Sequence, residues 1–252
     1  MAAATVRRAE VEPRAVTIPN MISPWFGPEH EGPARVPEVV WSRKNREAPH
    51  HGGAAVRDAD LKEGALQYLL VVSTLEPRKN HLTVIDAWEY LRSHGHPNLN
   101  LVFVGSLGWH HEDIMRRCAP WLQRGGLHLL ENVPAGDLRL LYRHAAATVC
   151  PSFGEGFDFA GIEAMLCGGV VVASDIPVHR EIYQDAAVHC SAYAASDMVQ
   201  AIGSLLGPEA APLRETLREA GRRVSALYAP ERVLPAWASL LERIAAEGGR
   251  SR

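Results

Sequence analysis

Short apolar runs alternate with longer stretches of helical character between residues 68 and 206, and this alternation restricts the fold more than any other feature of the sequence. Continuous apolar runs of this length are typical of parallel strands covered on both faces. The expected strands are Tyr68–Ser73, Leu99–Gly105, Leu127–Leu130, Ala147–Cys150, Gly169–Ala173 and Ala187–Cys190. Helices that connect parallel strands form right-handed crossovers, so the pattern predicts a doubly wound α/β sheet.

The connecting stretches show helical periodicity. The expected helices are His81–His94, Gly108–Arg124, Ala135–His144, Ala160–Leu166, Val178–Gln184 and Ala195–Leu206, followed by Pro212–Ala246 with an interruption at Ala229-Pro230. Ligands of doubly wound sheets bind beyond the carboxyl ends of the strands. We therefore expect the chemistry in the loops that follow Val72, Val104, Leu130, Val149 and Val172.

The segments outside this pattern differ in composition. Residues 1–14 are rich in Ala, Arg and Glu and are expected to be poorly ordered. Residues 15–64 are expected to form an irregular linker that begins with a short strand, Arg14–Ile18, and holds one helix near Val36–Arg46. We assign residues 65–208 to the sheet domain and residues 209–252 to C-terminal helices.

Composition excludes several classes of protein. The chain has 252 residues, 47% of them hydrophobic and 22% charged, which is typical of a globular protein. A net charge of -3 argues against a nucleic-acid partner. No apolar run is long enough to span a bilayer, and the first residues lack the apolar region of a secretory signal. We therefore expect a cytoplasmic location, with membrane contact only through a partner.

The four cysteines are Cys118, Cys150, Cys167 and Cys190, and they lie far apart without a C-x-x-C pair. This spacing argues against a zinc site or a redox motif. We expect them to be buried free thiols of a reducing compartment.

The most informative motif runs from Pro151 to Met165 and contains two glutamates, Glu155 and Glu163. Glu155 lies in a glycine-flanked loop after the fourth strand, and Glu163 lies about one turn into the next helix. Gly156 and Gly161 would let backbone amides approach a ligand closely, and the helix N-terminus favours a phosphate. On spacing alone, a solvated loop glutamate and an ordinary surface glutamate remain an alternative interpretation.

The complete string resembles the E-x7-E signature of retaining GT-B glycosyltransferases, the group 1 family that contains bacterial mannosyl- and glucosyltransferases of polysaccharide assembly. The resemblance extends from about Val16 to Ile244. It is carried also by Ile18–Asn20, Thr74–Asn80, Val104–Ser106, Leu141-Tyr142, Ser174–Glu181 and Asp185–Ala187. It implies a Rossmann-like domain, the C-terminal, donor-binding half of a GT-B fold.

The resemblance also implies roles for individual residues. The lysine at the position of Lys79 contacts the donor diphosphate, where a flexible point charge stabilises the leaving group. The glutamate at the position of Glu163 binds the ribose diol, and that at Glu155 lies near the transferred sugar. Glu155 and Lys79 are therefore the candidate catalytic residues. The other residues with an implied donor-binding role are Arg78, Gly105, Val133, Gly156, Phe157, Asp158 and Phe159. Val133 stands where the family's backbone reads the base, although a loop residue that covers the core is an equal alternative.

The sequence departs from the family pattern in two places. Many members have a glycine-arginine pair after the first strand of this domain, and this chain has Val72-Ser73, which leaves Arg78 as an uncertain substitute. The usual G-F-G-L-P is Gly156–Ala160 here, with Asp158 as a candidate helix N-cap or as a partner of a sugar hydroxyl. This variant is similar to that of polysaccharide mannosyltransferases and favours a GDP-mannose donor.

Other polar clusters carry weaker signals. Neither His110–Asp113 nor Asp58-Ala-Asp60 has convincing ligand spacing, so we expect no metal. His179 and Arg180 are expected to be solvated at the start of a short helix, with contact to the donor phosphate as the alternative. Three tryptophans at helical positions, Trp88, Trp121 and Trp237, are expected to pack on the sheet or to cap it.

These features together predict retaining, metal-independent hexosyl transfer, favoured to be mannosyl transfer, from a nucleotide sugar to a glycan or lipid-linked acceptor. In the family's mechanism the leaving phosphate oxygen takes the acceptor proton while attack occurs on the same sugar face. The family's first domain is absent from the sequence, so a partner protein supplies it or the chain is a fragment. Three alternatives remain: a non-catalytic sugar-nucleotide-binding module, a subunit whose apolar cleft face is an interface, and a sugar-nucleotide epimerase.

Overall fold

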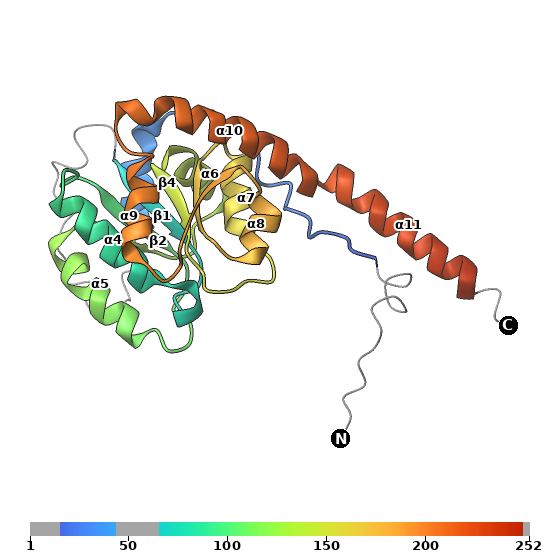
Figure 1. Cartoon of the computed structure of the whole chain (residues 1–252), viewed down its shortest axis with the longest axis horizontal. Helices are drawn as coiled ribbons and strands as arrows, with labels where there is room; N and C mark the ends of the chain where they lie inside the picture. The colour runs from blue at the N-terminus through green and yellow to red at the C-terminus, as the bar shows by residue number, and fades with distance from the viewer. Residues whose placement is uncertain (1–15, 44–65, 249–252) are drawn as a thin grey trace, which may run out of the picture.

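A computed structural model describes residues 16–43 and 66–248, which form a layered α/β structure (Figure 1). Its sheet has six parallel strands in the order β3-β2-β1-β4-β5-β6. The strands are β1 (Tyr68–Val72), β2 (Asn100–Val104), β3 (Leu127–Leu130), β4 (Ala147–Cys150), β5 (Val171–Ser174) and β6 (Ala187–Cys190). Each strand lies within two residues of the position expected from its apolar run, which confirms the doubly wound sheet.

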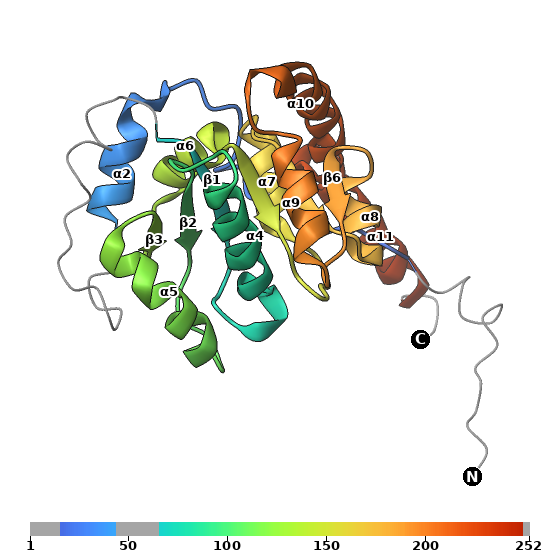
Figure 2. The same cartoon turned by 60° about the vertical axis from the view of Figure 1, so that its left-hand side comes forward.

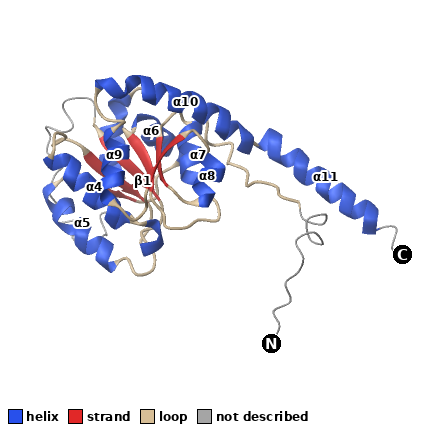
Figure 3. Cartoon of the chain, in the orientation of Figure 1, coloured by secondary structure: helices blue, strands red, loops and turns tan. Residues whose placement is uncertain are grey.

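Helices cover both faces of the sheet (Figures 2 and 3). They are α2 (Val36–Ser42), α4 (His81–Ser93), α5 (Glu112–Arg124), α6 (Ala135–His144), α7 (Phe159–Leu166), α8 (Pro177–Tyr183), α9 (Ala195–Gly203), α10 (Ala211–Ser225) and α11 (Pro230–Gly248). One apolar core joins the sheet to α4, α5 and α9, and a second joins it to α2, α6, α7, α8 and α10. Burial on both faces explains why the strand sequences are continuously apolar.

The chain reverses its winding direction between β1 and β4, which are neighbours in the sheet. From β1 the chain continues outward to β2 and β3, and β4 then starts the other half with β5 and β6. In such sheets a ligand usually binds beyond the carboxyl ends of the two strands at this reversal, here β1 and β4. The loops that carry Lys79 and Glu155 follow these two strands.

The segment before the sheet differs from the sequence expectation. Residues 16–18 form no strand, so the expected strand Arg14–Ile18 is wrong over its described part, and Arg14 and Ala15 lie outside the described residues. Instead, the Ile22 amide donates to the Tyr228 carbonyl at 3.0 Å, which places this segment beside the start of the C-terminal helix rather than along a sheet edge. The helix expected near Val36–Arg46 begins as predicted and ends at Ser42.

Parts of the expected segments fall outside the described residues. These are residues 1–14, expected to be poorly ordered, residues 44–65, which include most of the linker and Asp58-Ala-Asp60, and residues 249–252 of the C-terminal segment.

The C-terminal helices separate where Ala229-Pro230 interrupts them, as expected. Pro230 begins α11, because proline fits the first turn of a helix but not its interior. α11 projects away from the body of the molecule (Figure 1). Trp237 is therefore exposed on α11, and its expected packing against the sheet is wrong. Trp88 is buried and packs edge-on against Trp121 with ring centroids 4.7 Å apart, as expected.

All four cysteines are free and buried, which confirms their expected burial as free thiols. Burial raises the pKa of Cys118 and of Cys167 to about 12 and that of Cys190 to about 11. Within residues 16–43 and 66–248, no helix combines the length and the apolar character needed to cross a bilayer.

Candidate functional site

The loop after β1 is fixed to two other loops by the side chain of Asn80. Its backbone lies in the left-handed region (φ 55°), which asparagine tolerates better than most residues. Its side-chain amide donates to the carbonyl oxygen of Pro151, after β4, at 3.0 Å and to that of Ala192, after β6, at 2.8 Å. One buried side chain therefore holds the loops after β1, β4 and β6 together at the carboxyl edge of the sheet.

Glu155 is held by two cations from the loop after β1. Lys79 Nζ lies 2.6 Å from Oε1 of Glu155, and Arg78 Nη1 lies 2.7 Å from Oε2. The Glu155 side chain is only 5% exposed. Glu155 is therefore not a solvated loop residue, and the structure joins both candidate catalytic residues in one charge cluster.

Arg78 makes two further contacts in this cluster. It donates from Nη1 to the Gly154 carbonyl at 2.8 Å and from Nη2 to Oε1 of Glu76 at 2.8 Å. Glu76 is buried beside it. Two carboxylates therefore share the cations Arg78 and Lys79, so their positive charge is largely balanced within the protein.

Glu163 lies on α7, one turn after its start, as expected. Its Oε2 accepts a hydrogen bond of 2.8 Å from the hydroxyl of Tyr142, a buried residue of α6. Burial raises the pKa of Glu163 to about 7, against the opposing effect of the Tyr142 hydrogen bond. Glu163 is thus a partly buried carboxyl with no cation among its described contacts.

Asp158 is the N-cap of α7, as one of the two sequence interpretations holds. One of its carboxylate oxygens accepts from the Ala160 amide at 3.2 Å, and the other lies 3.3 Å from Nε2 of His179. The His179 contact has the length of an ion pair but not the geometry of a hydrogen bond. Burial raises the pKa of Asp158, but the opposing effects of His179 and Lys79 are larger in sum, so the net pKa shift is downward.

His179 is completely buried, so its expected solvation is wrong. Its Nδ1 lies 3.0 Å from both the hydroxyl and the carbonyl oxygen of Ser174, because the turn into α8 folds the ring back over the end of β5. Arg180 is solvated as expected and pairs with Asp175 at 2.6 Å.

Gly105, Gly156 and Gly161 were expected to contribute to the donor site, and the space around each of them differs. Gly105 has a φ of 153°, and a Cβ there would lie 2.1 Å from the Ser73 carbonyl oxygen, so its absence lets two strand ends approach each other. A Cβ at Gly161 would lie 2.3 Å from the Tyr183 hydroxyl. The Tyr183 side chain therefore occupies the space beside Gly161 where a ligand was expected. Gly156, like Gly154, has open space around it.

The remaining predicted donor-binding residues include Phe157, Phe159 and Val133. Phe157 is half-buried between Phe159 and Tyr228, with ring centroids 4.8 and 5.3 Å away. Phe159 is exposed. Val133 packs against the core after β3, as its alternative interpretation states, and no described contact joins it to Glu155.

Sequence reasoning missed three side chains that organise this region: Asn80, Tyr142 and His179. All three belong to stretches that carry the family resemblance, which was the available signal. Their roles depend on contacts between segments far apart in the chain, which one sequence does not show. No group of three or more His, Cys, Asp or Glu side chains in the described part of the chain is arranged to hold a metal ion. His111 instead contacts the Gly108 carbonyl at 2.6 Å.

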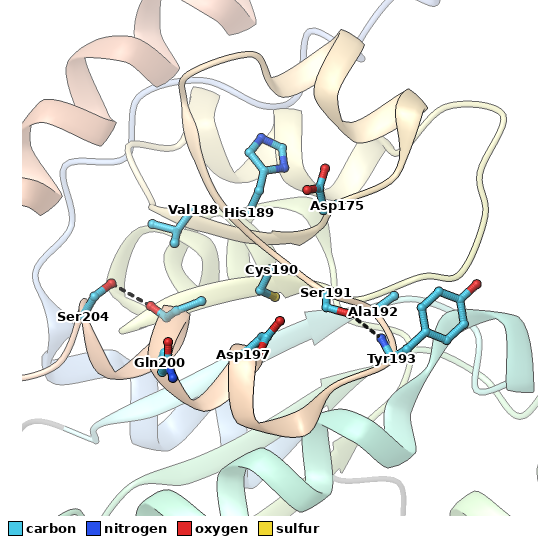
Figure 4. Close-up of a pocket in the computed structure, with 11 residues that line it drawn as sticks. Asp175, Val188, His189, Cys190, Ser191, Ala192, Tyr193, Asp197, Gln200 and Ser204 are labelled. Atoms are coloured by element: carbon cyan, nitrogen blue, oxygen red, sulfur yellow. Dashed lines mark hydrogen bonds between the residues drawn. The ribbon is translucent and has the colours of Figure 1, made fainter.

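A separate cavity of about 640 Å³ lies between β6 and α9 (Figure 4). Its lining includes Asp175, Ser191, Tyr193, Asp197, Gln200 and Ser204. It does not include Glu155 or Glu163. Its rim at Ala192 is nevertheless bonded to Asn80, the residue next to Lys79.

Sequence comparison finds similarity to one protein family and to bacterial enzymes. The model of the family described as glycosyl transferases group 1 matches residues 55–224. The O-antigen chain mannosyltransferase B of Escherichia coli is 34% identical over 119 residues, which cover 47% of this chain and 31% of that protein. The serotype-specific mannosyltransferase WbdA of Escherichia coli is 36% identical over 135 residues, 53% of this chain and 16% of the relative. The chain thus spans about a third or less of these relatives.

Structural comparison places the fold among larger enzymes. A glycosyltransferase from Rickettsia africae superposes with a TM-score of 0.68 at 17% identity, covering 93% of this chain and 58% of that one. Sucrose-phosphate synthase from Thermosynechococcus elongatus superposes with a TM-score of 0.70 at 21% identity, covering 95% and 56%. These likenesses confirm the Rossmann-like fold, which accounts for about half of each larger structure.

Proposed function

Because this chain belongs to the glycosyl transferases group 1 family, we propose that it is the donor-binding part of a retaining glycosyltransferase and takes part in hexosyl transfer from a nucleotide sugar. The observation that carries the proposal is the cluster of Glu155, Lys79 and Arg78 at the point where the sheet reverses direction. Doubly wound sheets bind nucleotides at this point.

The charge cluster suits a diphosphate that arrives with its own negative charge. Lys79 and Arg78 pair with Glu155 in the unliganded chain. A diphosphate offers both cations a second anionic partner, and Glu155 then becomes available to accept hydrogen bonds from sugar hydroxyls. Cations near the leaving group stabilise the charge that develops as the glycosidic bond breaks.

The N-terminus of α7 contributes less to phosphate binding than the family pattern implies. Asp158 already occupies the Ala160 amide, and its carboxylate places negative charge at the same helix end. A carboxylate there offsets the attraction of the helix dipole for an anion. We therefore place the diphosphate closer to Lys79 and Arg78 than to the first amides of α7.

Glu163 provides the other half of the proposed donor site. Its carboxylate would accept hydrogen bonds from the two ribose hydroxyls, and the Tyr142 hydroxyl fixes its orientation. The backbone near Val133 would read the base. We propose that the leaving phosphate oxygen takes the acceptor proton while attack occurs on the same face of the sugar. No covalent nucleophile and no metal is assigned.

The relatives support a mannose donor. Both Escherichia coli proteins bear the description mannosyltransferase, and the Asp158-Phe159 variant of the loop favours the same sugar. We propose GDP-mannose as the donor and a glycan or a lipid-linked sugar as the acceptor.

A complete enzyme would need a second domain that faces the donor site. The structural relatives are nearly twice as long as the part that superposes on this chain. We propose that this second domain carries most of the acceptor site, within the same or a separate polypeptide. The alternative function is a module that holds a sugar nucleotide without transferring it.

Calorimetric titration of the chain with GDP, UDP and ADP tests the donor site. We expect GDP to bind most tightly. The Glu163→Ala variant should bind GDP more weakly by about 1–3 kcal/mol, because charge-assisted hydrogen bonds to the ribose are lost. Glu219→Ala, which removes an exposed glutamate of α10, is the matched control and should bind normally. Unchanged affinity in Glu163→Ala would remove this residue from the ribose site.

Release of GDP from GDP-mannose separates transfer from binding. We expect release only when an acceptor and a protein supplying the second domain are both present. Tight binding without turnover in any combination would favour the non-catalytic module.

A further inference from the structure

Two aromatic rings form an exposed stack beside the proposed donor site. Phe153 is 39% exposed and Tyr193 is 81% exposed, and their ring centroids lie 5.1 Å apart at an interplanar angle of 28°. Phe153 precedes Glu155 by two positions in the loop after β4. Exposing two large rings to water costs free energy, so a stacked pair at this place indicates a surface that a ligand covers.

The stack is held in a fixed position relative to the charge cluster. The Phe153 amide donates to the Arg78 carbonyl at 2.9 Å. The Ala192 carbonyl, next to Tyr193, accepts from Asn80 at 2.8 Å. Both rings are therefore attached to the loop that carries Arg78 and Lys79, and a ligand on the rings lies close to the place of sugar transfer.

Tyr193 also forms one end of the cavity between β6 and α9. In Figure 4 it lies beside Ser191 and Ala192, and Ser204 lies at the opposite end. The volume of about 640 Å³ falls within the range of about 300–1,000 Å³ typical of small-molecule sites. Its polar lining combines two carboxylates, the Gln200 amide, hydroxyl groups and the His189 imidazole, a set that donates to and accepts from sugar hydroxyl groups. Burial lowers the pKa of His189, which favours its neutral form.

The charges of the cavity argue against an anionic ligand. Asp175 is neutralised by Arg180, with oxygen–nitrogen distances of 2.6 and 2.8 Å. The Asp197 carboxylate has no cation among its described contacts and accepts a hydrogen bond of 3.3 Å from the Ser196 hydroxyl. The balance is therefore negative, which repels a phosphate or an acidic sugar and suits a neutral polyol.

We propose that this cavity and the Phe153–Tyr193 stack form a carbohydrate subsite that holds a neutral pyranose of the acceptor glycan. The apolar C–H face of the sugar lies against the Tyr193 ring, and its hydroxyl groups bond to Asp197 and Gln200. Gln200 is exposed on the cavity face of α9, and its amide both donates and accepts. This subsite rests on the proposed function, and it makes an extended neutral glycan the acceptor rather than a single lipid-linked sugar.

Saturation-transfer NMR with a neutral α-linked mannotriose as the probe tests the subsite, because this method detects weak sugar binding. We expect transfer to the ring protons of the sugar in the unmodified chain. Tyr193→Ala should weaken binding by about twofold to tenfold, the range expected for one aromatic contact, whereas Tyr193→Phe should retain it. Gln200→Ala should also weaken it, and alanine keeps α9 helical.

Tyr90→Ala is the matched control. Tyr90 is an exposed tyrosine of α4 that stacks on the ring of His94, and it does not line the cavity. It should bind mannotriose normally. A trimer of glucuronic acid should not bind; equal binding of both trimers would overturn the assignment of a neutral ligand. Mannotriose binding that is absent, or equal in Tyr193→Ala and the unmodified chain, would overturn the subsite.

Titration of the same samples with GDP separates this test from that of the proposed function. Normal GDP binding without mannotriose binding would remove the subsite and leave the donor site in place. Loss of GDP binding with mannotriose binding retained would remove the donor site and leave a carbohydrate-binding surface.

Discussion

The two glutamates of the motif have opposite electrostatic surroundings, although both are largely shielded from water. Glu155 lies between Lys79 and Arg78 at distances of 2.6 and 2.7 Å. Glu163 has a tyrosine hydroxyl as its partner and a pKa raised by burial to about 7. Glu155 thus has two cationic partners, whereas Glu163 has none among its described contacts and a pKa raised to about 7. Two experiments at single residues follow from this contrast.

Glu155→Ala should leave GDP affinity unchanged or increase it, while it abolishes sugar transfer. The reason is that the substitution releases Lys79 and Arg78 from their internal partner and leaves both cations available to the diphosphate. Calorimetry with GDP and with guanosine measures the effect. Lys79→Ala provides the contrast, because it should weaken GDP binding and leave guanosine binding nearly unchanged. A Glu155→Ala chain that loses GDP affinity would contradict this account of the cluster.

GDP affinity should increase by up to about tenfold between about pH 6 and pH 8, because ribose hydroxyls donate to the ionised form of Glu163. Glu163→Gln should remove this dependence. Folding stability should show the opposite trend. The folded pKa of Glu163 is above the unfolded value of 4.5, so its stabilising effect is complete below that value and is lost as the pH rises through about 7. Parallel pH profiles of binding and of denaturant unfolding measure both effects.

At the scale of elements, α7 brings the site together through packing as well as through its N-terminus. Asp158 caps it, Glu163 extends from its second turn, and Gly161 receives the ring of Tyr183 from α8. The glycine that the sequence assigns to ligand access is thus needed for close contact between two helices.

Gly161→Ala should destabilise the fold by about 1–3 kcal/mol, since the added Cβ would lie 2.3 Å from the Tyr183 hydroxyl and would force the ring to move. Gly156→Ala, in open space, should change the free energy of unfolding much less. Chemical denaturation of the two variants measures the difference. Equal stability of both would show that α7 and α8 adjust to the extra methyl group.

The sequence predicts features that leave a local pattern more accurately than features that depend on how elements pack. The strands are predicted within two residues because burial on both faces requires continuous apolar runs such as Tyr68–Val72. Lys79 and Glu155 lie far apart in the sequence and come together because their loops follow β1 and β4. These two strands are adjacent in the sheet. The predicted exposure of His179 and the predicted packing of Trp237 are wrong, because burial depends on how a helix is oriented against the rest of the fold. That orientation leaves no periodic signal in a short helix such as α8.

At the scale of the whole molecule, the body of the protein is closed around its sheet while α11 extends beyond it (Figure 1). Its exposed apolar side chains, Leu234, Trp237, Leu241 and Ile244, contrast with Val233, which is buried against the body. The core of the described residues therefore does not depend on the distal part of α11.

The reactivity of the four cysteine thiols measures how often the folded structure opens. All are buried, two in contact with each apolar core, and burial keeps their pKa values well above neutral. Thiolates are the reactive form, so the folded chain should react with a thiol reagent at a rate limited by opening of the structure. Labelling monitored by mass spectrometry in increasing urea measures this rate. Fast labelling of one cysteine in native buffer would identify a core region that opens independently.

Because all four cysteines are buried, a spectroscopic probe can be attached to the chain at one added cysteine. A cysteine substituted for an exposed residue on α11 or on the rim beside Tyr193 would be the one thiol that a dye or spin label reaches under native conditions. None of the four original cysteines would have to be replaced first. Movements of the projecting helix and of the aromatic stack could then be followed by fluorescence or paramagnetic resonance in an otherwise unaltered protein.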